Sequence, residues 1–373
     1  MGALSRAVVV NQRLTISIVA TVRNEASVVE AWLDGLVGQS RQPDEIVVVD
    51  GGSSDGTSEA IERRARQFSF PIVLVSAPGA NISQGRNLAI ERATGDVIAV
   101  IDAGAVAHER WLECLVEPIL NDDVDVSSGF FVPVLDTAWQ RALAATTLPI
   151  VSEIDPNQFL PSSRSMAFRR AWFDAGVRYP EWLDYCEDLV WDLAMKRAGA
   201  RFRFVPEASV TFAVRPSPRS FAVQYFRYAR GDGKAGLFPR RHGLRYAAYA
   251  ALFVALRRRR PPELLVTGAL ATAYVWQPIV RLRTRDLANG TPIHATVAAV
   301  PLTVALRGLG DVAKMTGYPI GLAWRWRRFG GLGWRTAWPR VNPAGALFRP
   351  AALTRESQRP ASSLSGESRA EPR

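Results

Sequence analysis

Between residues 14 and 102 the sequence alternates short runs of β-branched residues with longer amphipathic stretches. The short apolar runs predict four strands, at Leu14–Ala20, Glu45–Asp50, Pro71–Ser76 and Asp96–Asp102. The stretches between them predict three helices, at Glu25–Val37, Ser58–Gln67 and Gln84–Arg92. Strands that are separated by helices form a mainly parallel α/β sheet, covered on both faces. Ligands of such sheets bind beyond the carboxyl ends of the strands, so polar residues there are the first site candidates.

After residue 102 the alternation is less regular, and it ends near residue 221. Further helices are expected at Trp111–Leu120, Ala138–Thr147, Arg169–Asp174 and Glu187–Ala198, and strands at Val124–Pro133 and Phe202–Val205. Three apolar stretches follow, at Leu244–Leu256, Leu264–Val280 and Ile293–Leu306. We expect an α/β domain over residues 1–220, a basic, apolar helical region over 221–345 and a disordered tail over 346–373, which is poor in large apolar residues.

The charge distribution favours a membrane partner for this helical region. The chain has a formal net charge of +11, and Asp232 is the only acid between Arg215 and Arg260. Basic residues that flank apolar runs suit an anionic lipid surface better than a nucleic-acid groove. Each apolar stretch is shorter than the roughly 20 residues that cross a bilayer. If the first stretch crossed the membrane, the arginines at 257–260 would lie outside the cell, although basic residues next to a membrane helix are normally on the cytoplasmic side. We therefore expect helices that lie in or re-enter the cytosolic leaflet. An ordinary buried helical subdomain is the alternative.

Cysteine and histidine are too sparse for a disulfide scaffold or a zinc enzyme. The chain has two cysteines and three histidines, and no HExxH or CxxC-type spacing. Only four apolar residues, Ala7–Val10, follow Arg6, which is too short for the core of a signal peptide. We therefore expect the N-terminal domain on the cytoplasmic side of the cell membrane.

Two predicted strands end in polar motifs. The first runs from Ile18 through Thr21 and Arg23 to Glu25, and the second carries Asp50 followed by Gly-Gly-Ser-Ser-Asp-Gly-Thr. A carboxylate at the end of a strand can accept hydrogen bonds from a nucleobase or a ribose. Glu25 could equally stabilise the start of a helix that Asn24 caps. The GxGxxG fingerprint of dinucleotide-binding proteins is absent.

Together these motifs resemble the family 2 glycosyltransferases of the GT-A fold, over about residues 14–236. Two further motifs extend the resemblance. They are Gly85-Arg-Asn87 and the Thr94-Gly-Asp that precedes the strand ending at Asp102. The resemblance implies that a nucleotide-sugar donor is bound by Thr21, Arg23, Glu25, Asp50, Arg86 and Asp102. In this assignment Asp50 contacts the base, Arg86 contacts the diphosphate or the base, and Asp55 fixes the turn. A local ion pair of Arg86 with Glu91 or Asp96 is the alternative.

The sequence departs from the family at Asp102-Ala-Gly104. The family motif is Asp-x-Asp, whose last carboxylate coordinates a divalent cation against the diphosphate. Mg²⁺ or Mn²⁺ remains the expected cofactor because carboxylate and phosphate oxygens suit both ions. Asp102 is then the metal ligand, and His108 or His242 could replace the missing carboxylate. Neutralisation by arginine and lysine, without a metal, is the weaker alternative.

A later acidic pair supplies the candidate catalytic base. Tyr185-Cys-Glu187-Asp188 opens a predicted helix and matches the family's Glu-Asp pair in order. The resemblance implies that Asp188 removes the acceptor's proton, that Glu187 positions the acceptor, and that Asp184 is the reserve candidate. Arg230, in an aromatic and basic segment that follows, is expected to stabilise the leaving diphosphate, although it could bind lipid phosphate instead.

The sequence therefore predicts an inverting glycosyltransferase that acts on a glycan or polyprenyl-linked acceptor, with a nucleotide-sugar donor and a membrane surface or bilayer as partners and no nucleic acid. A catalytically silent binding or scaffold subunit is one alternative, favoured by Gly104. A sugar-phosphate nucleotidyltransferase is another, but no glycine-rich basic loop precedes Asn24.

Overall fold

The computed structural model describes residues 13–330. The predicted tail over 346–373 lies outside the described residues, and so do Arg6 and Ala7–Val10.

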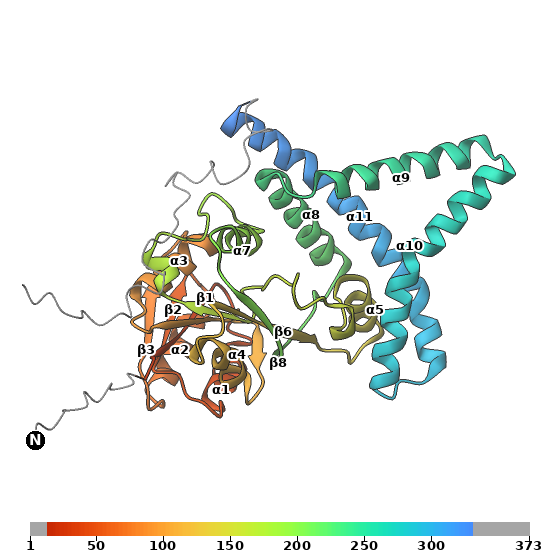
Figure 1. Cartoon of the computed structure of the whole chain (residues 1–373). Helices are drawn as coiled ribbons and strands as arrows, with labels where there is room; N and C mark the ends of the chain where they lie inside the picture. The colour runs from red at the N-terminus through yellow and green to blue at the C-terminus, as the bar shows by residue number, and fades with distance from the viewer. Residues whose placement is uncertain (1–12, 331–373) are drawn as a thin grey trace, which may run out of the picture.

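An eight-stranded mixed sheet organises the N-terminal part of the chain (Figure 1). The strand order is β3-β2-β1-β4-β7-β6-β8-β5. Its parallel half consists of β1 (Ile16–Val22), β2 (Glu45–Asp50), β3 (Ile72–Ser76) and β4 (Val97–Val100). This confirms the mainly parallel sheet and the four strands predicted at its start.

The second half of the sheet contains β5 (Ala105–Ala107), β6 (Val126–Pro133), β7 (Met166–Arg169) and β8 (Phe202–Phe212). Strand β7 runs antiparallel to both β4 and β6, whereas β6 and β8 are parallel. Strands β5 and β7 were not predicted, and β8 continues seven residues beyond the predicted end at Val205. The C-terminal end of β8 pairs with β5, which follows Asp102 directly.

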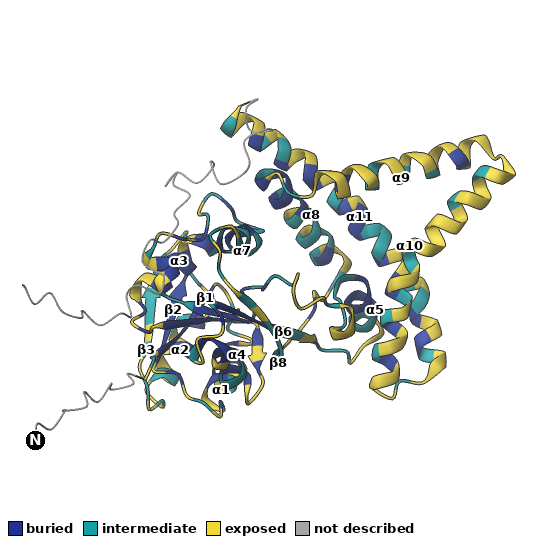
Figure 2. Ribbon diagram, viewed as in Figure 1, coloured by how far each residue is buried: buried dark blue, intermediate teal, exposed yellow. Residues whose placement is uncertain are grey.

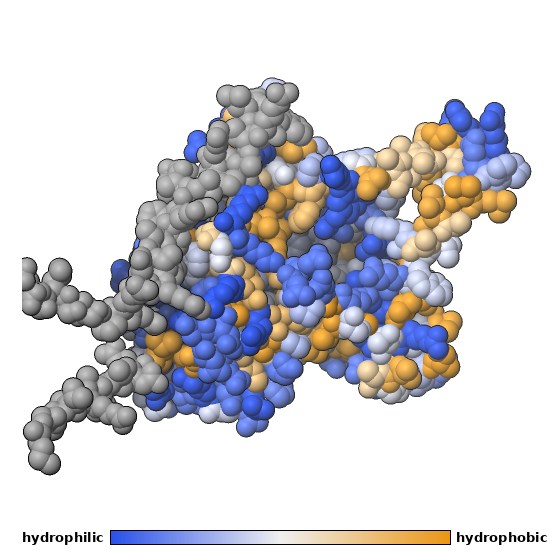
Figure 3. Space-filling view, in the orientation of Figure 1, coloured by the Kyte–Doolittle hydropathy of each residue, from blue (hydrophilic) through white to orange (hydrophobic). Residues whose placement is uncertain are grey.

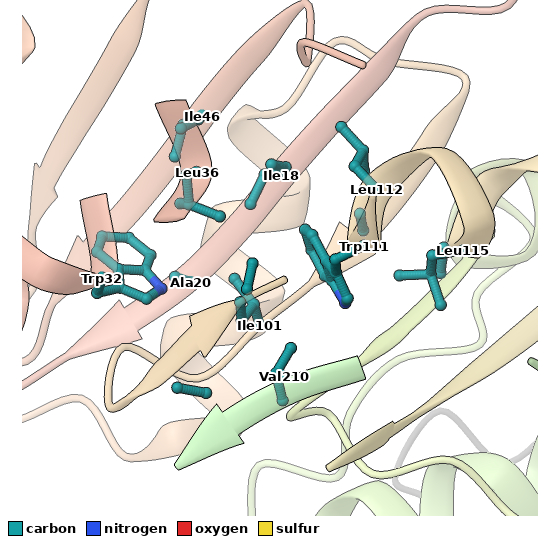
Figure 4. Close-up of a cluster of buried hydrophobic side chains, with 14 of the residues drawn as sticks. Ile18, Ala20, Trp32, Leu36, Ile46, Ile101, Trp111, Leu112, Leu115 and Val210 are labelled. Atoms are coloured by element: carbon teal, nitrogen blue, oxygen red, sulfur yellow. The ribbon is translucent and has the colours of Figure 1, made fainter. Parts of the chain in front are cut away.

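Helices cover both faces of the sheet. They are α1 (Val29–Val37), α2 (Thr57–Ala65), α3 (Ile82–Arg92), α4 (Trp111–Leu120), α6 (Ala171–Asp174) and α7 (Glu187–Arg197), whereas α5 (Ala138–Thr147) packs against the C-terminal helices instead. Alternate residues of β1 point to opposite faces. Ile18 and Ala20 pack with Trp32 of α1 and Trp111 of α4 (Figure 4), whereas Val19 belongs to the core on the α3 and α7 side. The burial of both faces keeps the strand ends rigid, and the candidate site lies at those ends.

From Pro218 to Phe329 the described chain is helical apart from short turns. It forms α8 (Pro218–Ala235), α9 (Pro239–Arg258), α10 (Pro261–Ala288) and α11 (Ile293–Phe329). Helix α8 packs along α11, and α5 packs against α10 and α11. Helix α9 and the first part of α10, residues 239–276, project from the body and are largely exposed (Figures 1 and 2). We call this segment the helical arm.

The contact between α8 and α11 is close because glycines face each other there. A Cβ atom added to Gly321 would clash with the carbonyl oxygen of Arg230 and lie 2.8 Å from the backbone nitrogen of Lys234. One added to Gly233 would lie 2.8 Å from the nitrogen of Leu322. The atoms that such a carbon would meet belong to the main chain, so the two helices can approach this closely only while both positions are glycine.

A buried acid ties the base of the arm together. Asp311 of α11 is fully buried and accepts hydrogen bonds from Arg245 (2.8 Å) and Tyr249 (3.2 Å) of α9 and from Tyr274 (2.5 Å) of α10. Among the described helices, α11 alone is long and apolar enough to cross a membrane, with 28% of its most apolar stretch buried in the molecule.

Candidate functional site

A cavity of about 880 Å³ opens at the carboxyl ends of β1, β2 and β4, between α7 and α8. This volume lies in the range of small-molecule sites. Most of the predicted site residues line it: Thr21, Arg23, Glu25, Arg86, Asp102, Asp184, Glu187, Asp188 and Arg230. The cavity thus brings together residues from Thr21 to Arg230, which are 209 positions apart in the sequence.

Arg86 of α3 connects the predicted donor and base residues. Its side chain is 3% exposed, and its guanidinium donates to Glu187 (2.6 Å) and to Asp102 (2.9 Å). The two local acids that could have paired with it have other partners. Glu91 binds Arg178, and the carboxylate of Asp96 accepts hydrogen bonds from Thr15. A planar guanidinium can serve two carboxylates at once, which a lysine ammonium does less well.

The first turn of α7 presents the acidic pair. Cys186, just before it, has a left-handed backbone conformation (φ 66°), which turns the chain into the helix. Burial, and then the neighbouring Asp188, raise the pKa of Glu187 above its ordinary value, and the guanidinium of Arg86 opposes this shift. Asp188 is less buried than Glu187, lines the cavity and accepts a hydrogen bond from the backbone of Leu189 (2.8 Å). Its carboxylate therefore remains accessible to a substrate.

Asp50 does not belong to the cavity lining, although its neighbour Gly51 does. One carboxylate oxygen accepts hydrogen bonds from the backbone of Gly52 (3.0 Å) and from the backbone and hydroxyl of Ser53 (both 2.8 Å), and the other accepts one from Ser58. Burial opposes ionisation, but these hydrogen bonds together lower the pKa of Asp50. In this geometry Asp50 holds the loop that follows β2.

Asp55 has a comparable role in the same loop. Its carboxylate accepts hydrogen bonds from the backbone nitrogens of Ala26 (3.0 Å) and Thr57 (3.1 Å). These contacts join the loop after β2 to the turn after β1, so the two polar motifs form one wall of the cavity.

Asp102 lies between two guanidinium groups. Arg86 pairs with one carboxylate oxygen, and Nε of Arg164 lies 3.5 Å from the other. A Cβ atom at Gly104 would meet no heavy atom within 4 Å. Within residues 13–330 no group of three or more His, Cys, Asp or Glu residues is arranged to hold a metal ion. Neither His108 nor His242 lines the cavity; His242 is buried and faces Asp232 (3.0 Å).

Arg230, the predicted diphosphate residue, pairs with Asp184. Lys234 donates to the same carboxylate (2.7 Å). Burial raises the pKa of Asp184, but Lys234 and Arg230 lower it by more than burial raises it, so the pKa lies below the ordinary value. An acid that two cations neutralise is a poor proton acceptor, which favours Asp188 over Asp184 as the base.

Four further arginines line the cavity but were not among the predicted site residues: Arg164, Arg215, Arg227 and Arg241. Arg164 lies in the polar segment before β7. Arg215 follows β8, and its place in the cavity could not be predicted because the predicted strand ended at Val205 and not at Phe212. Burial raises the pKa of Glu25, whereas the nearby Arg215 lowers it.

A model of the family described as "Glycosyl transferase family 2" matches residues 17–175. Glycosyltransferase AglE of Haloferax volcanii is 26% identical over 259 residues, which cover 67% of this chain and 83% of AglE. The uncharacterized glycosyltransferase EpsJ of Bacillus subtilis is 24% identical over 213 residues, 54% of this chain and 62% of EpsJ. The cholesterol galactosyltransferase of Borreliella burgdorferi is 28% identical over 118 residues, 31% of this chain and 33% of that protein.

Among solved structures, the mannosyltransferase PcManGT from Pyrobaculum calidifontis, in complex with GDP-Man and Mn²⁺, aligns with a TM-score of 0.48. It is 21% identical, and the alignment covers 84% of this chain and 87% of PcManGT. The resemblance in the strand-end motifs, the family match over residues 17–175 and the named relatives agree with one another. Residues 17–175 of this chain form a family 2 glycosyltransferase domain.

Proposed function

We propose that this glycosyltransferase moves a sugar from a nucleotide-sugar donor to an acceptor hydroxyl with inversion at the sugar C1 carbon. One observation carries the proposal: a single cavity joins the strand-end residues Thr21, Glu25 and Asp102 to Asp188 at the start of α7. The nucleotide would lie against the strand ends, and the acceptor would enter beside α7 and α8.

In this mechanism Asp188 acts as the general base. Its carboxylate takes the proton of the acceptor hydroxyl while that oxygen forms a bond to C1, and the bond from C1 to the donor diphosphate breaks on the opposite face. The buried ion pair of Glu187 with Arg86 fixes the first turn of α7 and so positions Asp188. Arg230 stays the candidate for stabilising the departing diphosphate, with Asp184 holding its guanidinium in place.

The candidate protein ligand for a divalent cation is Asp102. Its carboxylate is already shared by Arg86 and Arg164, and the neighbouring position 104 is a glycine. This donor set suits Mg²⁺ or Mn²⁺ that arrives with the diphosphate better than an ion that the protein holds by itself. When bound, the ion would supply positive charge to the diphosphate oxygens.

The acceptor in this proposal is a glycan on a lipid such as a polyprenyl carrier, presented at the cytoplasmic face of the membrane. The helical arm supports it, because Leu244, Phe253 and Leu265 are 72%, 67% and 74% exposed. Apolar side chains cover much of the arm in Figure 3, and the arginines at 257–260 lie at its tip. Exposed apolar residues next to cations suit an anionic bilayer surface.

The proposal is tested with the Asp188→Asn variant. A panel of UDP-, GDP- and dTDP-sugars is first screened by thermal shift to find a donor. With that donor, Asp188→Asn should fold and bind as the native chain does but transfer sugar about 10²- to 10⁴-fold more slowly. Asp174→Asn, at an exposed acid of α6 outside the cavity, is the control. Undiminished transfer by Asp188→Asn would refute the base assignment.

A further inference from the structure

Arg164 is held rigidly at the border between the strand ends and α8. Its side chain is 21% exposed, and its guanidinium lies over the rings of Phe212 (4.6 Å) and Phe131 (5.2 Å). Stacking on two aromatic rings restricts a long side chain and so reduces the entropy that it would lose on binding a ligand. The planar face is occupied by these rings, but the edge that donates hydrogen bonds remains directed toward the cavity side of Asp102.

The guanidinium faces the place where the family motif would bring a cation. Asp102 would have to share its carboxylate between a metal ion, Arg86 and Arg164, and position 104 contributes no second carboxylate. Arg215 adds positive charge on the same side, beside Glu25. Two arginines thus lie where diphosphate charge needs neutralising, and bidentate guanidinium groups match phosphate oxygens well.

We propose that Arg164, assisted by Arg215, binds the donor's diphosphate directly, so that a nucleoside diphosphate stays bound when divalent cations are removed. This inference rests on the proposed function, since it assumes a nucleotide-sugar donor in the cavity. Arg230, which pairs with Asp184 on the α8 side of the cavity, keeps its proposed role at the departing diphosphate.

The first experiment is calorimetric titration of the full chain with UDP and with GDP, in EDTA and in MnCl₂. Native affinity for the nucleotide that binds should differ less than about tenfold between the two buffers. Arg164→Met, which keeps the packing on the aromatic rings, should weaken binding about 10- to 100-fold in both. Arg164→Lys, which keeps the charge, should fall between. The control is Arg178→Met, since Arg178 also stacks on a phenylalanine and pairs with an acid but lies outside the cavity.

A second variant adds the missing carboxylate and leaves Arg164 intact. Gly104→Asp restores the family motif at a position with open space and an ordinary backbone conformation. It should make nucleotide affinity rise about tenfold or more on adding Mn²⁺, whereas Gly104→Asn, of equal size, should not.

Binding that disappears in EDTA would overturn the inference, as would an Arg164→Met variant that binds as tightly as the native chain. If Mn²⁺ did not raise the nucleotide affinity of Gly104→Asp, the inference that position 104 lacks a metal-binding carboxylate would be overturned. Failure of the native chain to bind UDP, GDP and also dTDP in either buffer would instead count against the proposed function.

Discussion

Replacing Gly321 with alanine should push α11 away from α8 and destabilise the helical region. The added carbon would clash with the carbonyl oxygen of Arg230 and lie 2.8 Å from the nitrogen of Lys234. Non-bonded carbon contacts need about 3.5 Å or more. Because the obstructing atoms are backbone, no side chain can rotate away, and the helices themselves must separate.

The magnitude follows from two opposing effects. Overpacking of this kind costs about 1–3 kcal/mol. Alanine in place of glycine within a helix returns about 0.5–1 kcal/mol. The free energy of unfolding should therefore fall by roughly 0.5–2 kcal/mol. Because Arg230 is in the contact and also lines the cavity, the KM for the donor should rise as well.

Urea unfolding followed by far-ultraviolet circular dichroism measures the change as a lower midpoint at constant slope. Gly308→Ala is the matched control, since Gly308 belongs to the same helix and an added Cβ would meet no atom within 4 Å. That variant should gain up to about 1 kcal/mol. If Gly321→Ala proved as stable as Gly308→Ala, the claim that the close contact of α8 and α11 requires glycine at position 321 would be wrong.

Three further outcomes are expected. Arg86→Met should lower the free energy of unfolding by about 3–5 kcal/mol in urea titrations, because Glu187 loses its buried partner, and adding Glu187→Gln should recover part of the loss. Burial raises the pKa of Glu45, but hydrogen bonds from Ser17 and Thr94 lower it by more, to below 4.5. The stability that the carboxylate adds is therefore present above pH 4.5 and is lost as the pH falls through the folded-state pKa. In an acid titration, the Glu45→Gln variant should lose less stability than the native chain. Replacing Phe253 and Leu265 together with serine should reduce flotation with anionic vesicles and leave circular dichroism unchanged, and equal flotation would contradict the role of the helical arm.

The regular first half of the fold was predictable because its strands and helices are encoded by local periodicity. Strand β7 was not, since Met166–Arg169 is only four residues long and follows a polar segment without alternation. It exists because it pairs with β4 and β6, which lie more than thirty positions away. Pairing of this kind depends on the assembled sheet and leaves little trace in the short segment itself.

The sequence predicted which residues belong to the candidate site better than it predicted which of them contact each other. Motif order pointed to Asp102, Glu187 and Asp188, which the fold gathers around one cavity. The partners of Arg86 could not be read locally: its nearest acids in sequence bind elsewhere, and one of its actual partners is 101 residues away. Asp50 shows the converse, since a strand-end acid can be fully engaged by its own loop.

The helical arm also has a consequence for local stability. Most residues of the arm are exposed, so most of the main-chain hydrogen bonds along it are shielded by the helix alone. Amide hydrogens there should exchange with solvent deuterium much faster than those of α8 and α11. Contact with a bilayer would slow that exchange, so the arm itself would report when the enzyme has settled on its surface.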